Sequence, residues 1–169
     1  MRLVSAIAAL LMTASCAQDP KFESIRLSAP ITSAQMATYA DGGTGRIEGQ
    51  AFLRQDGGSV VTCAGSEVLL MPDVASTREI VNLLKEGRVA SMRVNGQRPS
   101  TLFPRAFRKK WCDSDGGFAF DQLASGSWIL MTDVQWKAGV DVYGGVMIGY
   151  LNVPDDGVEE VILSRSHLI

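Results

Sequence analysis

Two acidic residues set close together, Asp113 and Asp115, are the first candidates for chemistry in this chain. They stand in the run Asp113-Ser114-Asp115-Gly116-Gly117, directly before an alternating Phe-Ala-Phe. Calcium favours several carboxylate oxygens, but no glutamate follows at the twelfth position that a calcium loop needs. Aspartates and glycines in this order also build a tight turn between two strands. We favour the turn, and expect no metal site.

Catalytic groups are scarce elsewhere in the chain. The single histidine, His167, lies near the end of the sequence, so a zinc peptidase could not draw its several ligands from it. No serine stands in a Gly-x-Ser-x-Gly turn, and no glycine-rich loop leads into a helix as a phosphate site requires. A carboxylate pair could cleave glycosides, but nothing selects one pair among the acids. We expect neither an enzyme nor a cofactor.

The first residues have the pattern of an export signal. Arg2 precedes an apolar run over residues 3–12, which is too short to span a membrane. Thr13-Ala14-Ser15-Cys16 resembles a bacterial lipobox, although the lipobox prefers leucine where Thr13 stands. That resemblance implies a signal peptide over residues 1–15 and a lipoprotein whose Cys16 carries acyl lipid such as palmitate. Ala17 as the second mature residue implies the outer membrane; ordinary cleavage after Ala17 is the alternative.

Hydrophobic periodicity divides the remaining chain into a tether over residues 16–44 and one domain over 45–169. A short helix is expected over 33–39. Ser76 and Glu79 match a capping box, and Ile80, Leu83 and Leu84 follow at helical spacing, so a helix over 76–86 is predicted, ended by Gly87.

Alternating residues predict seven strands near 46–53, 67–71, 108–113, 118–120, 128–136, 146–153 and 158–163. Seven short strands separated by glycine turns indicate a mainly β sandwich.

Four stretches carry a resemblance to a known family. Gly45 to Gly49, Ala64 to Pro72, Asp113 to Phe120 and Leu123 to Leu130 resemble, in order and spacing, the carboxypeptidase regulatory-like family. The resemblance implies a prealbumin-like, transthyretin-type sandwich of Ig-like Greek-key character, used as a structural or binding unit. The chain departs from the family by a helical insertion over residues 74–108.

The three cysteines fit this picture. With Cys16 lipidated, Cys63 and Cys112 remain, and an oxidising compartment would pair them. Cys63 precedes the second family strand and Cys112 ends the third, so antiparallel pairing of these strands would bring them together. We predict a Cys63–Cys112 disulfide, with two separate buried thiols as the alternative.

The insertion is strongly basic. Between Arg78 and Lys110 there are nine basic and two acidic residues, in a chain whose overall net charge is −2. An anionic envelope partner is one interpretation, whether lipid, glycan or protein; the other is that this segment folds onto its own acidic sandwich. Nucleic acid does not fit an exported chain. The candidate partner-binding residues are Arg93, Arg98, Phe103, Arg105, Phe107, Arg108, Lys109 and Lys110.

We therefore expect a non-catalytic lipoprotein of the cell envelope, in the periplasm or at the surface, acting as a binding or scaffolding module. The alternative is a carbohydrate-binding module that stacks a sugar on Trp111, Trp128 or Trp136. Trp128 and Trp136 share a strand face with Leu130 and Val134, which indicates core packing rather than an exposed platform.

Overall fold

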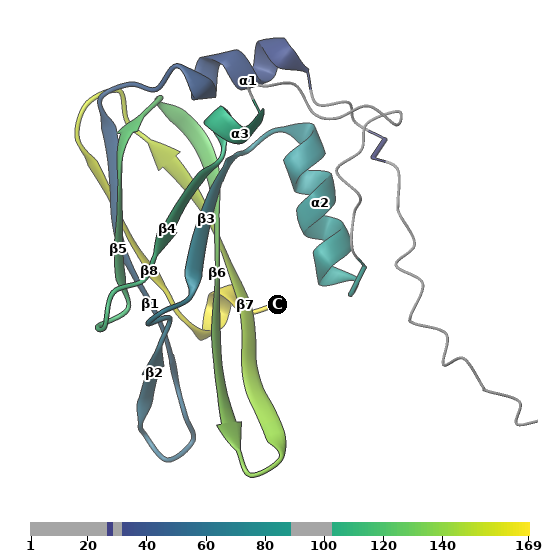
Figure 1. Cartoon of the computed structure of the whole chain (residues 1–169), viewed down its shortest axis with the longest axis vertical. Coiled ribbons are helices and arrows are strands. Elements are labelled where there is room, and N and C mark those ends of the chain that lie inside the picture. Colours follow the sequence, from purple (N-terminus) through teal and green to yellow (C-terminus); the bar gives the residue numbers. More distant parts are fainter. Residues whose placement is uncertain (1–26, 29–31, 89–102) are drawn as a thin grey trace, which may run out of the picture.

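In a computed structural model, the chain folds into two antiparallel-rich β-sheets packed face to face, with helices at one end and along one side (Figure 1). The structure describes residues 27–28, 32–88 and 103–169. The predicted signal peptide, Cys16, Arg93 and Arg98 lie outside these residues. No helix in the described ranges is long and apolar enough to cross a membrane.

The first sheet is built around β1 (Gly45–Arg54). This strand pairs antiparallel with β5 (Gly117–Leu123) along its first half and with β2 (Val60–Thr62) along its second half. On its other side it runs parallel to β8 (Val158–Leu163). The first and last strands of the domain are therefore neighbours at the centre and edge of one sheet.

The second sheet has the order β4-β3-β6-β7. Its strands are β3 (Glu67–Pro72), β4 (Arg108–Trp111), β6 (Gly126–Ala138) and β7 (Asp141–Val153). β6 is a central strand, as predicted, and both of its faces are apolar. Trp128, Leu130 and Val134 point into the core between the sheets, whereas Ile129 packs on the outer face against Met71 and α2.

Three helices and a final turn complete the fold: α1 (Ser33–Ala40), α2 (Ala75–Lys85), α3 (Phe103–Ala106) and the 3₁₀ turn η1 (Arg165–His167). α2 lies along the outer face of the second sheet, where Val81 is fully buried against Met71 and Ile129. α1 crosses one end of the sandwich and packs against α3 through Met36, which is fully buried (Figure 1).

The β-sandwich prediction is confirmed, with eight strands in the described ranges rather than the seven predicted. The additional strand, β2, is only three residues long, and its pattern is too short to show a period. The helices predicted over 33–39 and 76–86 are present as α1 and α2. α3 was not predicted, because one helical turn carries no hydrophobic repeat.

The predicted capping box at the start of α2 is wrong. The helix is capped at Val74, whose N–H donates to Thr77 Oγ1 at 3.0 Å. The hydroxyl of Ser76 is buried without a hydrogen-bond partner among the described residues. Glu79 instead accepts the N–H of Ser28 at 2.8 Å, so the segment before α1 is held against α2. Ser76 and its neighbour Thr77 both carry a hydroxyl group, and sequence spacing did not show which of the two caps α2.

The turn at Asp113 is confirmed. Its Oδ1 accepts the N–H groups of Asp115 at 2.9 Å and of Gly117 at 2.7 Å, while Gly116 takes a positive φ of 79°. One carboxylate oxygen is thus used to close the β4–β5 connection. The predicted disulfide is also present: Cys63 and Cys112 are bonded, with Cα atoms 5.8 Å apart, and it ties the end of β4 to the segment between β2 and β3.

Candidate functional site

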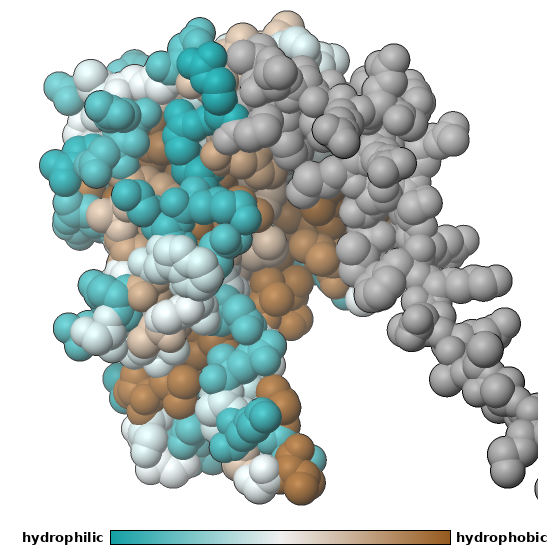
Figure 2. Space-filling model, viewed as in Figure 1, coloured by the Kyte–Doolittle hydropathy of each residue, from teal (hydrophilic) through white to brown (hydrophobic). Residues whose placement is uncertain are grey.

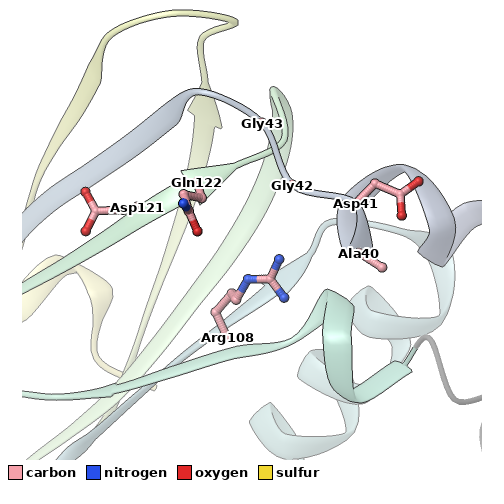
Figure 3. A pocket seen from close by; sticks show the side chains of 7 residues that line it. All are labelled: Ala40, Asp41, Gly42, Gly43, Arg108, Asp121 and Gln122. Atoms are coloured by element: carbon pink, nitrogen blue, oxygen red, sulfur yellow. The ribbon is translucent and has the colours of Figure 1, made fainter.

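A polar pocket lies at the end of the sandwich where α1 leads into β1 (Figure 3). It opens between β4, the edge strand of the second sheet, and β5, the edge strand of the first. Its volume is about 550 Å³. The lining residues come from three separate parts of the chain: Ala40, Asp41, Gly42, Gly43, Arg108, Asp121 and Gln122.

Arg108 is the central side chain of this pocket. It extends from β4 toward the α1–β1 linker, with Gln122 opposite (Figure 3). The side chain is half-buried, and its guanidinium makes no ion pair or hydrogen bond with any described residue. Burial lowers the pKa of Arg108, and the nearby charge of Arg105 lowers that pKa further. A guanidinium stays protonated in proteins, so the pocket holds a partly desolvated positive charge that forms no ion pair with a described carboxylate.

Three other polar residues line the pocket: Asp41, Asp121 and Gln122. Asp121 is occupied by Arg46, with Oδ1 and Nε 2.9 Å apart. The carboxylate of Asp41 and the amide of Gln122 make no hydrogen bond within the described part of the chain. The pocket therefore offers one cation, one free carboxylate and one free amide to a bound molecule. Such a set can bind an anionic group and hydroxyls, but it contains no nucleophile with an adjacent base.

The backbone of the pocket is tightly constrained. Gln122 has a φ of 56°, the one positive value for a non-glycine residue in the described ranges. Its carbonyl accepts the N–H of Gly43 at 3.3 Å. A Cβ on Gly42 would lie 2.8 Å from that carbonyl oxygen, and one on Gly43 would lie 2.6 Å from the carbonyl oxygen of Leu123. Glycines at both positions are thus required for the linker to approach β5.

The predicted partner-binding residues are only partly brought together. Arg108 lines the pocket, and Arg105 is exposed near it. Lys109 faces the other side of β4 and pairs with Glu67, with Nζ and Oε1 2.8 Å apart. Lys110 is exposed. Phe107 is half-buried, packing against both the Met36 cluster and the Met71 cluster. The side chain of Phe103 lies outside the described part.

The described residues of the basic segment differ in their surroundings. Lys109 is exposed but paired with Glu67, and Phe107 packs within the fold, whereas Arg108 has no ion pair or hydrogen bond with another described residue. Asp41, Asp121 and Gln122 were missed as pocket residues. They lie far from Arg108 in the sequence, and only the fold places them around it. The glycine pair Gly42-Gly43 is the sole signal in the sequence for a close approach there.

The three tryptophans have different surroundings. Trp128 is fully buried, and its Nε1–H donates to the carbonyl of Ala124 at 3.0 Å. It therefore cannot serve as a sugar platform. Trp111 is 68% exposed on β4. Trp136 is half-buried at the far end of the sandwich and stacks on Tyr143, with ring centroids 5.8 Å apart and planes 16° from parallel.

No protein-family model matches the chain, and no curated protein is similar enough to count as a relative. Among solved structures, the chain is similar to a presumed carbohydrate-binding protein from Pseudomonas aeruginosa. The two share 18% sequence identity with a TM-score of 0.62, over 81% of this chain and 99% of that one. This similarity shows that the two proteins share a fold.

A minor pilin of Streptococcus agalactiae is a weaker match. It has 14% identity and a TM-score of 0.36, over 73% of this chain and 45% of that one. A TM-score at this level carries no conclusion about function or fold.

Proposed function

We propose that the chain is a non-catalytic binding module of an exported lipoprotein, tethered to the cell envelope through Cys16, and that its ligand presents an anionic group to Arg108. The observation that carries this proposal is the half-buried side chain of Arg108, which pairs with no described residue and lines a polar pocket of about 550 Å³. A partly buried charge that lacks an ion-pair partner costs free energy, and a bound anion would offset this cost. A carboxylate or phosphate would supply the missing counter-ion through two parallel hydrogen bonds.

Membership of the carboxypeptidase regulatory-like family is part of the same proposal. The positions of the motifs support it: the Asp-x-Asp-Gly run is the β4–β5 turn, and the Leu-x-x-Gly run is the β5–β6 corner. The disulfide and the β fold are compatible with export.

The variant Arg108→Ala tests the pocket, and Lys109→Ala is its matched control. Both remove one positive charge from adjacent positions of β4, but Lys109 points away from the pocket and is paired. We expect Arg108→Ala to lose binding of a glucuronic acid disaccharide or of inorganic phosphate in isothermal titration, with Lys109→Ala unchanged. The two probes separate a carboxylate ligand from a phosphate ligand. Equal weakening by both variants would mean that only the overall charge matters.

The tether is tested separately by mass. Intact protein extracted from its native membrane should carry a diacyl or triacyl mass on Cys16, and an unlipidated mass would remove the tether from the proposal. Capture of membrane partners by the wild-type chain, and their loss with Arg108→Ala, would connect the pocket to the envelope.

A carbohydrate-binding module is the second candidate function. The observation that favours it is the stacked pair Trp136–Tyr143 beside a groove, and the shared fold of the Pseudomonas aeruginosa protein is consistent with it. Trp128 is excluded as a stacking platform by its complete burial, which agrees with the core packing predicted for it.

A further inference from the structure

The hairpin formed by β6 and β7 extends beyond the rest of its sheet. β6 pairs with β3 only as far as Met131, whereas its pairing with β7 continues to Ala138. The last part of the hairpin is therefore a two-stranded ribbon, which lies near the β1–β2 hairpin at the same end of the sandwich (Figure 1). Val140 and Val142 are exposed at the tip of the β6–β7 hairpin, and Figure 2 shows patches of hydrophobic surface toward this end of the molecule.

Because β3 does not extend as far as β6 and β7, no other described strand of this sheet pairs with the last part of the ribbon, and one of its faces is only partly covered. Trp136 and Tyr143 are directly opposite each other on this ribbon, which is why their rings stack. Trp136 packs partly against the core, and Tyr143 is 46% exposed. An aromatic ring that is half in water at the mouth of a groove can receive a ligand on its free face.

A groove of about 190 Å³ runs between the ribbon, the end of β1 and the chain's last turn. This is smaller than the roughly 300–1,000 Å³ of pockets for drug-sized ligands. Its size suits one ring rather than an extended chain. Its lining includes Gln55, Asp56, Trp136, Tyr143, Gly144 and Arg165.

The polar side chains of the groove remain available for hydrogen bonds. Arg165 donates from Nη2 to the carbonyl of Arg54 at 3.2 Å, and the same nitrogen lies 3.9 Å from Asp56 Oδ1. Both side chains are exposed, so this ion pair is weak and does not fix either group in place. The amide of Gln55 has no hydrogen-bond partner in the described ranges. Carboxylate, guanidinium and amide together can bind several hydroxyl groups.

The backbone beside the aromatic pair requires glycine. Gly144 has a φ of 88°, and a Cβ there would overlap the carbonyl oxygen of Val134. Glycine at this position lets β7 stay paired with β6 next to Tyr143 while no side chain fills the groove.

We propose that this groove binds a single neutral sugar ring, with the C–H face of the sugar on Tyr143 and its hydroxyls on Asp56, Arg165 and Gln55. The proposal rests on the second candidate function and assigns its site. Sugar C–H bonds carry a small positive charge and are attracted to the negative face of an aromatic ring. The site lies at the opposite end of the sandwich from Arg108, so the two sites are separate.

The test is titration of the full chain with glucose, galactose, mannose and N-acetylglucosamine, followed by calorimetry. We expect saturable binding of at least one of them, weakened about tenfold (about 1.4 kcal/mol) by Tyr143→Ala, because that variant removes the aromatic face on which the sugar packs. Trp111→Ala is the matched control, because it removes an exposed aromatic ring from β4 and should leave binding unchanged. Arg165→Met, at an exposed position, gives a second test if Tyr143→Ala fails to fold.

The outcomes separate the site from the function. Saturable binding that Tyr143→Ala and Arg165→Met leave unchanged overturns this site but keeps a carbohydrate function elsewhere. Loss of binding with Trp111→Ala alone moves the platform to β4 and also overturns the site. No saturable binding by any of the four sugars overturns both. None of these three outcomes affects the test of the Arg108 pocket, because that test uses anionic probes.

Discussion

The phenol ring of Tyr39 stands edge-on against the indole of Trp128, with centroids 4.9 Å apart and planes at 87°. Tyr39 belongs to α1, within the segment assigned from the sequence to the tether, and Trp128 is in the core of the sandwich. The contact fastens α1 to the end of the fold, and with it the linker that borders the Arg108 pocket.

Stability should fall at high pH because of Tyr39. Burial, and next the charge of Asp73, raise the pKa of Tyr39 above the ordinary value of 10.0. The unfolded chain then ionises at a lower pH than the folded one, so the contribution of Tyr39 to stability is complete below pH 10.0 and lost as the pH rises through the folded value. Urea unfolding at increasing pH should show a smaller decline for Tyr39→Phe. Tyr143→Phe controls for the loss of a phenol; an identical decline in Tyr39→Phe and wild type would contradict the assignment.

The start of α2 provides a matched pair of substitutions at neighbouring positions. Thr77 Oγ1 accepts the N–H of Val74 and donates to the carbonyl of Pro72, so Thr77→Ala should cost about 1–2 kcal/mol. Ser76→Ala removes a buried hydroxyl without a partner and should be neutral or stabilising. Chemical denaturation of both variants checks the pair. The reverse order would restore Ser76 as the cap.

Arg108 should contribute to anion binding while lowering the stability of the ligand-free fold. Because burial lowers the pKa of its guanidinium, the folded state without ligand disfavours this charge. We expect Arg108→Met to match or exceed the wild-type free energy of unfolding while losing anion binding. Excess phosphate should then raise the Tm of the wild type but not of the variant. A clear loss of stability in Arg108→Met without phosphate would indicate that Arg108 acts mainly in packing.

Loss of the Cys63–Cys112 disulfide should destabilise the fold by about 4 kcal/mol, because the bond closes a loop of 49 residues. The double variant Cys63→Ala/Cys112→Ala measures this in urea, and the wild type in reductant is its control. A loss below about 1 kcal/mol in both would mean that the unfolded chain is already compact without the bond.

Most of the fold could be predicted from the sequence, because alternation and glycine turns are local signals. The strands near Ile47, Val68 and Leu130 show this alternation plainly. The turn at Asp113 could be predicted because the aspartate side chain itself accepts the N–H groups that close it. The cysteine pairing also followed, since strand direction fixes which ends meet. The capping residue of α2 could not be predicted, because Ser76 and Thr77 are chemically alike and only the helix start distinguishes them.

The candidate sites were harder to predict than the fold. The charge pattern identified Arg108 within a group of basic residues, but sequence could not show that Lys109 is paired while Arg108 is not. The alternation of residues along β4 separates the two, and its register is set by pairing with β3. The aromatic pair of the groove depends on Trp136 lying opposite Tyr143, which is fixed by the length of the β6–β7 turn.

The parallel pairing of β1 with β8 has a mechanical consequence. Six residue pairs join these strands, from Arg46 with Val158 to Ala51 with Leu163. Since the strands run in the same direction, the start of β1 and the end of β8 lie at opposite ends of the pair. A pull between these two ends loads all the inter-strand bonds in shear at once, rather than opening them one after another. Tension applied through the N-terminal segment would thus load the first sheet in shear, the direction in which its paired strands resist separation most.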